Sequence, residues 1–380
     1  MSKAIKVMTV FGTRPEAIKM APIVQALQRN PAFVPVTVVS AQHREMLDQA
    51  LQVFNIHPDY DLDIMRAGQS LAQITSRVLL ALGDVLTREQ PDIVLVHGDT
   101  TTTFAACLAA FYQQVPVGHV EAGLRTWAKY NPFPEEMNRQ LTDVLADLYF
   151  APTAQSRDNL LLEHHAAAHI FVTGNTAIDA LHETVNAQYH HDVLDKISAN
   201  QRMILVTMHR RENQGEPMRR TLNAMLDVLR AHPDVKIVYP VHLSPAVQRV
   251  AHAVFDGQER VHLIEPLDVV DFHNLAARSY FIMSDSGGVQ EEAPSLGKPV
   301  LVLRDTTERP EGVAAGTLRL VGTDPDRVRT AMTQLLDDPA VYNQMAGARN
   351  PYGDGHATER ILAAIQYHFG VTVTRPAEFS

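Results

Sequence analysis

The stretch "VFGTRPEAIKMAPI", Val10–Ile23, decides how the beginning of this chain folds. The apolar run Ile5–Phe11 is typical of a buried strand. It ends at Gly12, which allows a turn, and a helical pattern begins at Pro15, which suits a first helical turn. A strand that turns directly into a helix is the first half of a βαβ unit. Arg14 adds a cation at the helix start, where free amides already attract anions, so we expect an anionic ligand at this turn.

Short runs rich in valine and isoleucine recur along the chain and alternate with longer helical patterns, which indicates parallel sheets. Eleven such runs are many for one open sheet, so we expect an α/β protein with two doubly wound, Rossmann-like domains joined near Gly174-Asn175-Thr176. Ligands of such folds lie beyond the carboxyl ends of strands, which predicts a ligand cleft between the domains. The expected strands after the first are Val36–Ser40, Ile93–His97, Val117–Val120, Leu148–Ala151, Ile170–Thr173, Met203–Thr207, Lys236–Pro240, Val261–Ile264, Tyr280–Ser284 and Val300–Leu303.

Composition excludes several classes of protein. The 380 residues are 46% hydrophobic, enough for a large core, and 33 Lys and Arg face 43 Asp and Glu, a formal net charge of −10. That balance argues against nucleic acid or an anionic membrane as partner. The single Cys107 permits neither an internal disulfide nor a cysteine metal cluster, and no run of 18 apolar residues is present. We therefore expect a soluble protein of the cytoplasm.

Acidic side chains follow neighbouring strands in the first half of the chain. Asp99 comes after the third expected strand, Glu121 comes after the fourth, and Glu135 and Glu136 open a later helical pattern. Each carboxylate could serve only as a cap or a partner of a helix dipole, but three acids at adjacent strand ends suggest acid/base chemistry. The threonines Thr100–Thr103 could cap the backbone or bind phosphate.

The second half carries features suited to a diphosphate. His209 and Arg210 follow a strand, and Ser286-Gly287-Gly288 forms a turn whose free amides open a helix. Glu292, one helical turn further, could reach ribose hydroxyls, and Arg309 adds a cation after the next strand. The turn matches neither a P-loop nor the G-x-G-x-x-G dinucleotide fingerprint, so we expect a nucleotide diphosphate without NAD.

These motifs together resemble a known family. "GTRPEAIKMAPI", "HGDTTTT", "GHVEAGLRT", "NPFPEEMNR", "HRREN" and "SDSGGVQEEAPSLGKPVLVLRDTTERPEG" are similar, in the same order, to motifs of the non-hydrolysing bacterial UDP-N-acetylglucosamine 2-epimerases. The resemblance implies the glycosyltransferase-B architecture, with domains at residues 1–173 and 174–357 and a last helix, at about 358–380, that returns to the first domain. It also implies a homodimer that needs no metal and no cofactor.

The resemblance also assigns roles to particular residues of this chain. It implies acid/base carboxylates at Asp99, Glu121 and Glu135 and an active-site histidine at His209. It implies contacts to the UDP-sugar from Arg14, Lys19, Phe272, Ser286, Gly287, Gly288, Glu292 and Arg309.

The implied reaction is reversible epimerisation at C2 of UDP-N-acetylglucosamine. The proton at C2 has no adjacent carbonyl to make it acidic, so the family eliminates UDP to give 2-acetamidoglucal and adds it back after protonation of the opposite face. This requires one group that removes a proton, one that delivers it, and cations or amides that stabilise departing UDP. We assign proton transfer to Asp99 with Glu121 or Glu135 and stabilisation of the diphosphate to His209, with base and acid left undecided. The surface polysaccharide that consumes the product is also left open.

The stretch "QHREM" beginning at Gln42 resembles the family's activator motif, which implies that the substrate binds a second time as an allosteric activator. Without the resemblance it would indicate only a helix start with a capping histidine. The residues expected at this second site are Gln42, His43, Gln69, Glu136, Arg210 and His242.

Three other functions remain as alternatives. A glycosyltransferase of the same architecture would share the Ser-Gly-Gly helix but would not need three carboxylates, and a hydrolysing epimerase would release UDP and N-acetylmannosamine. A catalytically silent nucleotide-sugar sensor would be expected to lack some proton-transfer residues. His97 and His119 also offer the ligand types of a divalent metal site, although strand-end histidines more often serve as hydrogen-bonded scaffold.

Overall fold

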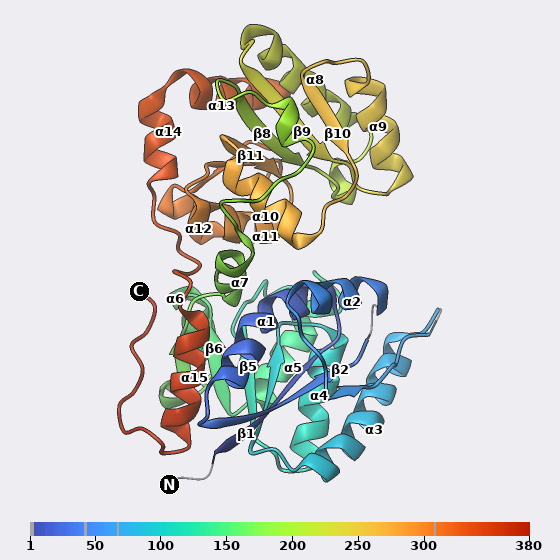
Figure 1. Cartoon of the computed structure of the whole chain (residues 1–380). Helices are drawn as coiled ribbons and strands as arrows, with labels where there is room; N and C mark the ends of the chain where they lie inside the picture. Colours follow the sequence, from blue (N-terminus) through green and yellow to red (C-terminus); the bar gives the residue numbers. More distant parts are fainter. Residues whose placement is uncertain (1–3, 42–43, 67, 308) are drawn as a thin grey trace. The chain divides into compact units, whose positions relative to one another are not determined.

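The computed structural model describes residues 4–41, 44–66, 68–307 and 309–380 and divides into two compact units (Figure 1). The first comprises Met1–Glu183 and Gly353–Ser380, and the second Thr184–Tyr352. The first unit includes helix α7 (Thr176–Thr184) as far as Glu183, whereas the expected boundary is residue 173. Asp179 on α7 accepts hydrogen bonds from the amides of Ala357 and Thr358, at 3.2 and 2.8 Å, which ties the returning C-terminal segment to the same unit.

The first unit contains a seven-stranded parallel sheet in the order β3-β2-β1-β4-β5-β6-β7. Its strands are β1 Ile5–Phe11, β2 Phe33–Val39, β3 Tyr60–Asp61, β4 Ile93–His97, β5 Val117–Val120, β6 Leu148–Ala151 and β7 Ile170–Val172. Its other helices are α1 Arg14–Arg29, α2 Arg44–Val53, α3 Leu71–Glu89, α4 Thr101–Tyr112, α5 Glu135–Leu145, α6 Ala154–Leu162 and α15 Ala357–His368. Helix α15, red in Figure 1, packs against α1, although the two are far apart in sequence.

The second unit contains a six-stranded parallel sheet in the order β10-β9-β8-β11-β12-β13. Its strands are β8 Arg202–Thr207, β9 Val235–Pro240, β10 Val261–Ile264, β11 Phe281–Ser284, β12 Val300–Val302 and β13 Leu318–Leu320. Its helices are α8 Glu216–Ala231, α9 Pro245–Phe255, α10 Val269–Arg278, α11 Gly287–Glu292, α12 Pro310–Ala315, α13 Pro325–Asp337 and α14 Pro339–Ala346. The expectation of two Rossmann-like α/β domains is confirmed.

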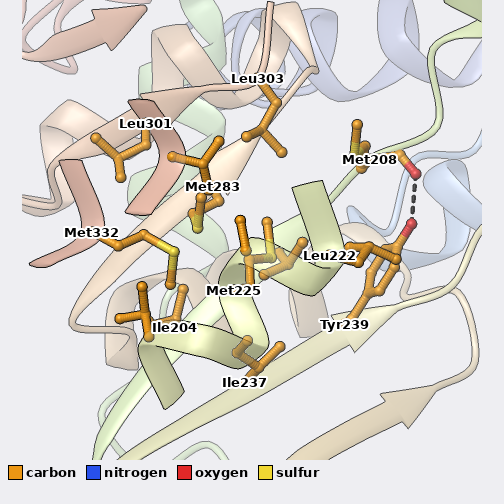
Figure 2. Packing of buried hydrophobic residues seen from close by; sticks show 14 of the residues in the cluster. Ile204, Met208, Leu222, Met225, Ile237, Tyr239, Met283, Leu301, Leu303 and Met332 are labelled. Carbon is orange, nitrogen blue, oxygen red and sulfur yellow. Dashed lines mark hydrogen bonds between the residues drawn. The ribbon is translucent and has the colours of Figure 1, made fainter. Parts of the chain in front are cut away.

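An apolar core fills the space between the second sheet and its helices (Figure 2). Met283 on β11 and Met225 on α8 are fully buried in it. Tyr239 is also fully buried, and its hydroxyl donates a hydrogen bond of 2.6 Å to the carbonyl oxygen of Met208, which satisfies the one polar atom that its ring brings inside. Burial of a large side chain of this kind contributes about 1.5–3 kcal/mol to stability. The hydrogen bond from Tyr239 to Met208 also ties the loop after β8 to this core.

Each sheet reverses its strand order at one point, and the polar motifs lie there. The reversal falls between β1 and β4 in the first unit and between β8 and β11 in the second. Connections on either side of a reversal leave in opposite directions, which opens a crevice at the carboxyl ends of the two strands. Arg14 and Asp99 follow β1 and β4, and His209 and Ser286 follow β8 and β11. No helix among the described residues is long and apolar enough to cross a membrane.

Candidate active site

A buried glutamate that the sequence analysis did not single out joins the two loops at the reversal of the first sheet. Oε2 of Glu16 accepts hydrogen bonds from the amides of Gly12 and Thr13, at 3.1 and 2.7 Å, and from the Thr13 hydroxyl, at 2.7 Å. Its Oε1 lies 2.7 and 3.0 Å from the hydroxyls of Thr100 and Thr103. Burial raises the pKa of Glu16, while the hydrogen bonds act in the opposite direction. These two threonines therefore hold the loop that carries Arg14.

The two basic residues expected on this loop and helix differ in their surroundings. Arg14 is the first residue of α1 and half-buried, and within the described part of the chain its guanidinium makes no hydrogen bond or ion pair. Lys19, one turn further along α1, forms an ion pair with Oε2 of Glu121. The structure thus brings Lys19 to a predicted carboxylate and leaves the charge of Arg14 available to an anion.

Glu121 is held in place by its backbone and by its partners. It follows β5 with a φ of 67°, in the left-handed region that is uncommon for residues other than glycine. Its Oε2 accepts a hydrogen bond of 3.0 Å from the side-chain amide of Asn175 as well as the Lys19 contact. A Cβ atom at Gly98 would lie 3.6 Å from Oε1 of Glu121, so the carboxyl group packs over the turn that precedes Asp99. Asn175 comes from the segment that sequence reasoning treated as a domain join.

Asp99 is paired with a cation from α5. Its carboxylate forms an ion pair with Arg139, and its carbonyl oxygen accepts a hydrogen bond of 3.0 Å from the Asn138 side chain. Arg139 and Asn138 both belong to the motif "EEMNR". Glu135, at the start of the same helix, is half-buried and has no hydrogen bond or ion pair to the rest of the described chain. The structure therefore joins Asp99 to α5 and does not pair Glu135 with either of the other carboxylates.

Glu136 and Gln69 of the expected activator site are both occupied by contacts within the first unit. Glu136 is fully buried, and its carboxylate accepts hydrogen bonds of 3.0 and 3.1 Å from the amides of Thr126 and Trp127. Burial acts to raise its pKa, but these bonds outweigh it and the pKa lies below the usual value. Gln69 accepts a hydrogen bond of 2.7 Å from Arg77.

Gln42 and His43, the other two activator residues in the first half of the chain, lie outside the described residues.

His119 is scaffold. Its Nδ1 lies 2.6 Å from Oδ1 of Asp143 and its Nε2 2.7 Å from the carbonyl oxygen of Gly98, and the ring is fully buried. Both nitrogens are thus engaged, so His119 cannot bind a metal together with His97 without losing one of these bonds. The described residues do include one group with three possible metal donors, the exposed His190, Asp192 and Asp195, which contains none of the predicted site residues.

In the second unit, a buried aspartate organises the loop after β8. Asp285 accepts hydrogen bonds of 2.9 Å from the amides of His209 and Arg210 and from the side chain of Asn213. Nδ1 of His209 lies 3.4 Å from the same carboxylate, and its ring stacks on that of His242, with 5.3 Å between centroids. Burial lowers the pKa of His209. The structure therefore brings His209 and His242 together, and Asp285 is a site residue that sequence reasoning missed although it lies within the "SDSGG" motif.

The Ser-Gly-Gly turn lies against a predicted cation. Ser286 is the cap of α11, and a Cβ atom added to Gly287 would come within 3.2 Å of the guanidinium carbon of Arg309. Glu291 holds that guanidinium through contacts of 2.9 and 2.8 Å. Three of the predicted diphosphate ligands, Ser286, Gly287 and Arg309, therefore lie in one place.

Glu292 is linked to the helix that carries Phe272. Nε2 of His273 lies 3.3 Å from Oε2 of Glu292, and Nδ1 of His273 lies 2.6 Å from the hydroxyl of Thr184. The Phe272 ring is partly buried and packs against the adjacent apolar cluster. A cavity of about 510 Å³ next to this helix is lined in part by Pro266, Leu267 and Asp271 but not by Phe272. His273 is a further residue that the sequence did not single out.

Two Rossmann-like units with charged side chains at their strand-order reversals define a protein of the glycosyltransferase-B class. Comparison with known proteins identifies the group within that class. The chain belongs to the UDP-N-acetylglucosamine 2-epimerase family, whose sequence model matches residues 25–366.

Individual relatives match over nearly their whole length. A UDP-N-acetylglucosamine 2-epimerase of Bacillus subtilis is 60% identical over 378 residues, which cover 100% of this chain and 99% of the relative. A crystal structure from Listeria monocytogenes is similar at 58% identity with a TM-score of 0.95, and each chain is covered completely. The UDP-GlcNAc 2-epimerase of Neisseria meningitidis, solved bound to UDP-GlcNAc, is similar at 50% identity and a TM-score of 0.85, covering 95% of this chain and 99% of the other.

Proposed function

We propose that the protein interconverts UDP-N-acetylglucosamine and UDP-N-acetylmannosamine without net hydrolysis. The observation that carries this proposal is the pair of carboxylates Asp99 and Glu121, each ion-paired with a cation at the carboxyl ends of neighbouring strands, in a chain of the 2-epimerase family. The relative from Neisseria meningitidis, which was solved with UDP-GlcNAc bound, supports the choice of substrate.

Ion pairing suits these carboxylates to proton transfer at C2. An adjacent cation favours the ionised form of a carboxylate, which is the form that the proton acceptor needs, whereas the group that delivers a proton to C2 must start the step protonated. One carboxylate removes the C2 proton as the bond from C1 to the UDP oxygen breaks, which leaves 2-acetamidoglucal and UDP. A second group then delivers a proton to the opposite face of C2 while UDP adds back to C1. We assign these transfers to Asp99 with Glu121 or Glu135.

The second unit binds and stabilises the UDP part. The amides at the Ser286 turn and the guanidinium of Arg309 provide donors and positive charge for a diphosphate. His209, next to Arg210, stabilises the charge that develops on departing UDP. Glu292 receives the ribose hydroxyls. Arg14 and Lys19 of the first unit also contact the UDP-sugar, whose diphosphate carries the negative charge that suits two cations.

Proton NMR of UDP-N-acetylglucosamine with the protein in heavy water, without acceptor, metal or nicotinamide, tests the proposal. Appearance of UDP-N-acetylmannosamine with deuterium at C2 is the expected result. Accumulation of free UDP and free sugar would instead identify a hydrolysing epimerase. No change at all would favour a glycosyltransferase, which needs an acceptor, or a nucleotide-sugar sensor.

We propose further that UDP-N-acetylglucosamine activates the enzyme from a second site that includes Gln42, His43 and Arg210. The expected result is an initial rate that rises more steeply with substrate than a hyperbola, and a strictly hyperbolic dependence would argue against the second site.

We propose finally that the protein is a homodimer of the cytoplasm and that it supplies activated N-acetylmannosamine for the synthesis of a surface polysaccharide. The exposed apolar side chains of Leu80, Phe111 and Tyr112 on α3 and α4 offer a surface that a second copy of the chain could cover. Light scattering after size-exclusion chromatography measures the oligomeric state directly.

A further inference from the structure

His97, the last residue of β4, is a buried histidine without a hydrogen bond. Its side chain is 4% exposed, and neither ring nitrogen has a hydrogen-bond partner in the part of the chain that the structure describes. Buried polar atoms are almost always paired, because an unmade bond leaves the cost of desolvation uncompensated. The mechanism proposed above makes no use of this side chain.

The ring points toward a predicted acid/base carboxylate. Nε2 of His97 lies 3.8 Å from Oε2 of Glu121, the oxygen that also receives Lys19 and Asn175. An approach of about 0.6 Å would bring the two atoms to about 3.2 Å, the outer limit of an ordinary hydrogen bond. His97 is therefore next to Glu121 but not yet bonded to it.

Burial keeps the His97 ring neutral. Burial lowers its pKa to about 4, and Lys19 and His119 act in the same direction, while Glu121 and Asp99 oppose them. The neutral ring has one N–H, which can be donated from Nε2.

His119 on the neighbouring strand has the opposite character. Its Nδ1 faces the Asp143 carboxylate and its Nε2 faces the carbonyl oxygen of Gly98, so both nitrogens are already engaged. The other oxygen of Asp143 receives Arg125 at 2.5 Å. Burial acts to raise the pKa of Asp143, but His119 and Arg125 outweigh it and the pKa lies below its usual value. Two histidines at adjacent strand ends thus differ in their contacts, and of the two only His97 has an N–H that is not already engaged.

We propose that His97 is a positioning residue for Glu121: its neutral ring donates the Nε2 proton to the Glu121 carboxylate when Lys19 leaves that carboxylate for the anionic substrate. The donated hydrogen bond replaces the ion pair and keeps the carboxylate oriented through turnover, while the proton stays on His97. This inference rests on the proposed function, which gives Glu121 a role in proton transfer.

Three substitutions separate this role from a merely structural one. The amide of glutamine reaches the position of Nε2, whereas the amide of asparagine reaches only that of Nδ1, and phenylalanine fills the space without a donor. We expect His97→Gln to retain kcat within about 3-fold, and His97→Asn and His97→Phe to lose about 10-fold or more, with KM nearly unchanged in all three. UDP affinity, measured by calorimetry, should equal that of the wild type. The exposed His252→Gln on α9 is the matched control.

The pH profile gives a second readout. In His97→Phe the acidic limb of the kcat profile should move to higher pH, because a carboxylate that loses a donor is protonated more readily. The profile of His97→Gln should stay in place. Equal kcat and equal profiles for the three variants, or an effect on KM alone, would overturn the proposal.

Nitrogen-15 NMR of the imidazole groups in the wild-type protein provides a test that does not need turnover. The His97 signal, assigned by its loss in His97→Gln, should report a neutral ring protonated at Nε2 between pH 5.5 and 8. A proton on Nδ1, or titration within that range, would overturn the proposal even if the other variants fail to fold. If the wild type leaves UDP-N-acetylglucosamine unchanged, the proposed function fails, and this spectrum still decides the state of His97.

Discussion

Replacement of Glu16 tests whether its carboxylate holds the β1–α1 loop to α4. Glu16→Ala removes the acceptor for the buried amides of Gly12 and Thr13 and for three hydroxyls. Hydroxyls can rotate toward other acceptors, but the two amides cannot. Each buried donor left unpaired costs about 1–3 kcal/mol, so we expect a loss of about 2–6 kcal/mol in the free energy of unfolding of the first unit.

Glu16→Gln should be far less damaging, although it removes the same charge. The amide oxygen can take the place of Oε2 and accept from both backbone amides. The amide nitrogen then lies where Oε1 was and donates to the hydroxyls of Thr100 and Thr103, which can accept. We expect a cost of about 1 kcal/mol or less.

Differential scanning calorimetry measures both changes. For a unit of roughly 200 residues, 1 kcal/mol moves Tm by about 2–4 °C, so Glu16→Ala should lower the Tm of the first unit by at least about 4 °C. Glu216→Ala is the control, because Glu216 also lies in a first helical turn but its side chain is 76% exposed. Equal damage by the Ala and Gln variants would refute the hydrogen-bond argument. A Glu16→Ala variant as stable as the control would refute any contribution of the loop contact.

The difference in stability between the wild type and Glu16→Gln should depend on pH. Burial raises the pKa of Glu16 above its unfolded value, so between the two values the folded state binds more protons than the unfolded state. Stability from this group is therefore greatest at low pH and falls as pH rises through that window. The stability of the wild type relative to Glu16→Gln should decline across the window, and an increase with pH would contradict the assignment.

Three further predictions concern catalysis and UDP binding. Asp99→Asn should reduce turnover by about 10³-fold or more while UDP affinity by calorimetry stays close to that of the wild type, and loss of both together would undo its role as a proton-transfer group. Gly287→Ala should weaken UDP binding about 10-fold, because its Cβ would displace the Arg309 guanidinium, whereas Gly83→Ala on α3, with its nearest neighbour at 3.9 Å, is the control that should bind UDP normally. Asp285→Ala should lower both the Tm of the second unit and turnover, because it leaves two amides of the loop after β8 unpaired, and unchanged values of both would show that the loop is held by other contacts.

Local pattern was sufficient for most of the fold. The expected strands Ile5–Phe11, Ile93–His97, Val117–Val120, Leu148–Ala151 and Val261–Ile264 have the same bounds in the structure. Alternation of apolar runs with helical patterns is a property of neighbouring residues, so a single sequence displays it. Strand β3 was missed because two residues are too few to show any periodicity, and β13 was missed because its three residues, Leu-Arg-Leu, do not form an apolar run.

The sequence by itself also determined the family, since six long motifs in order allow few alternatives, and it determined that acids and cations follow the strands. It could not determine which side chains form hydrogen bonds or ion pairs with one another. Thr100 reads as a cap or a phosphate ligand, and it became both a cap and a partner of Glu16, 84 residues away. His97 and His119 both lie near the ends of apolar strands, yet His97 has no hydrogen bond among the described residues, whereas both ring nitrogens of His119 are engaged. Strand pairing and burial decide which side chains meet and in what dielectric, and these depend on residues far apart in sequence, so only the tertiary structure could assign the partners and the protonation.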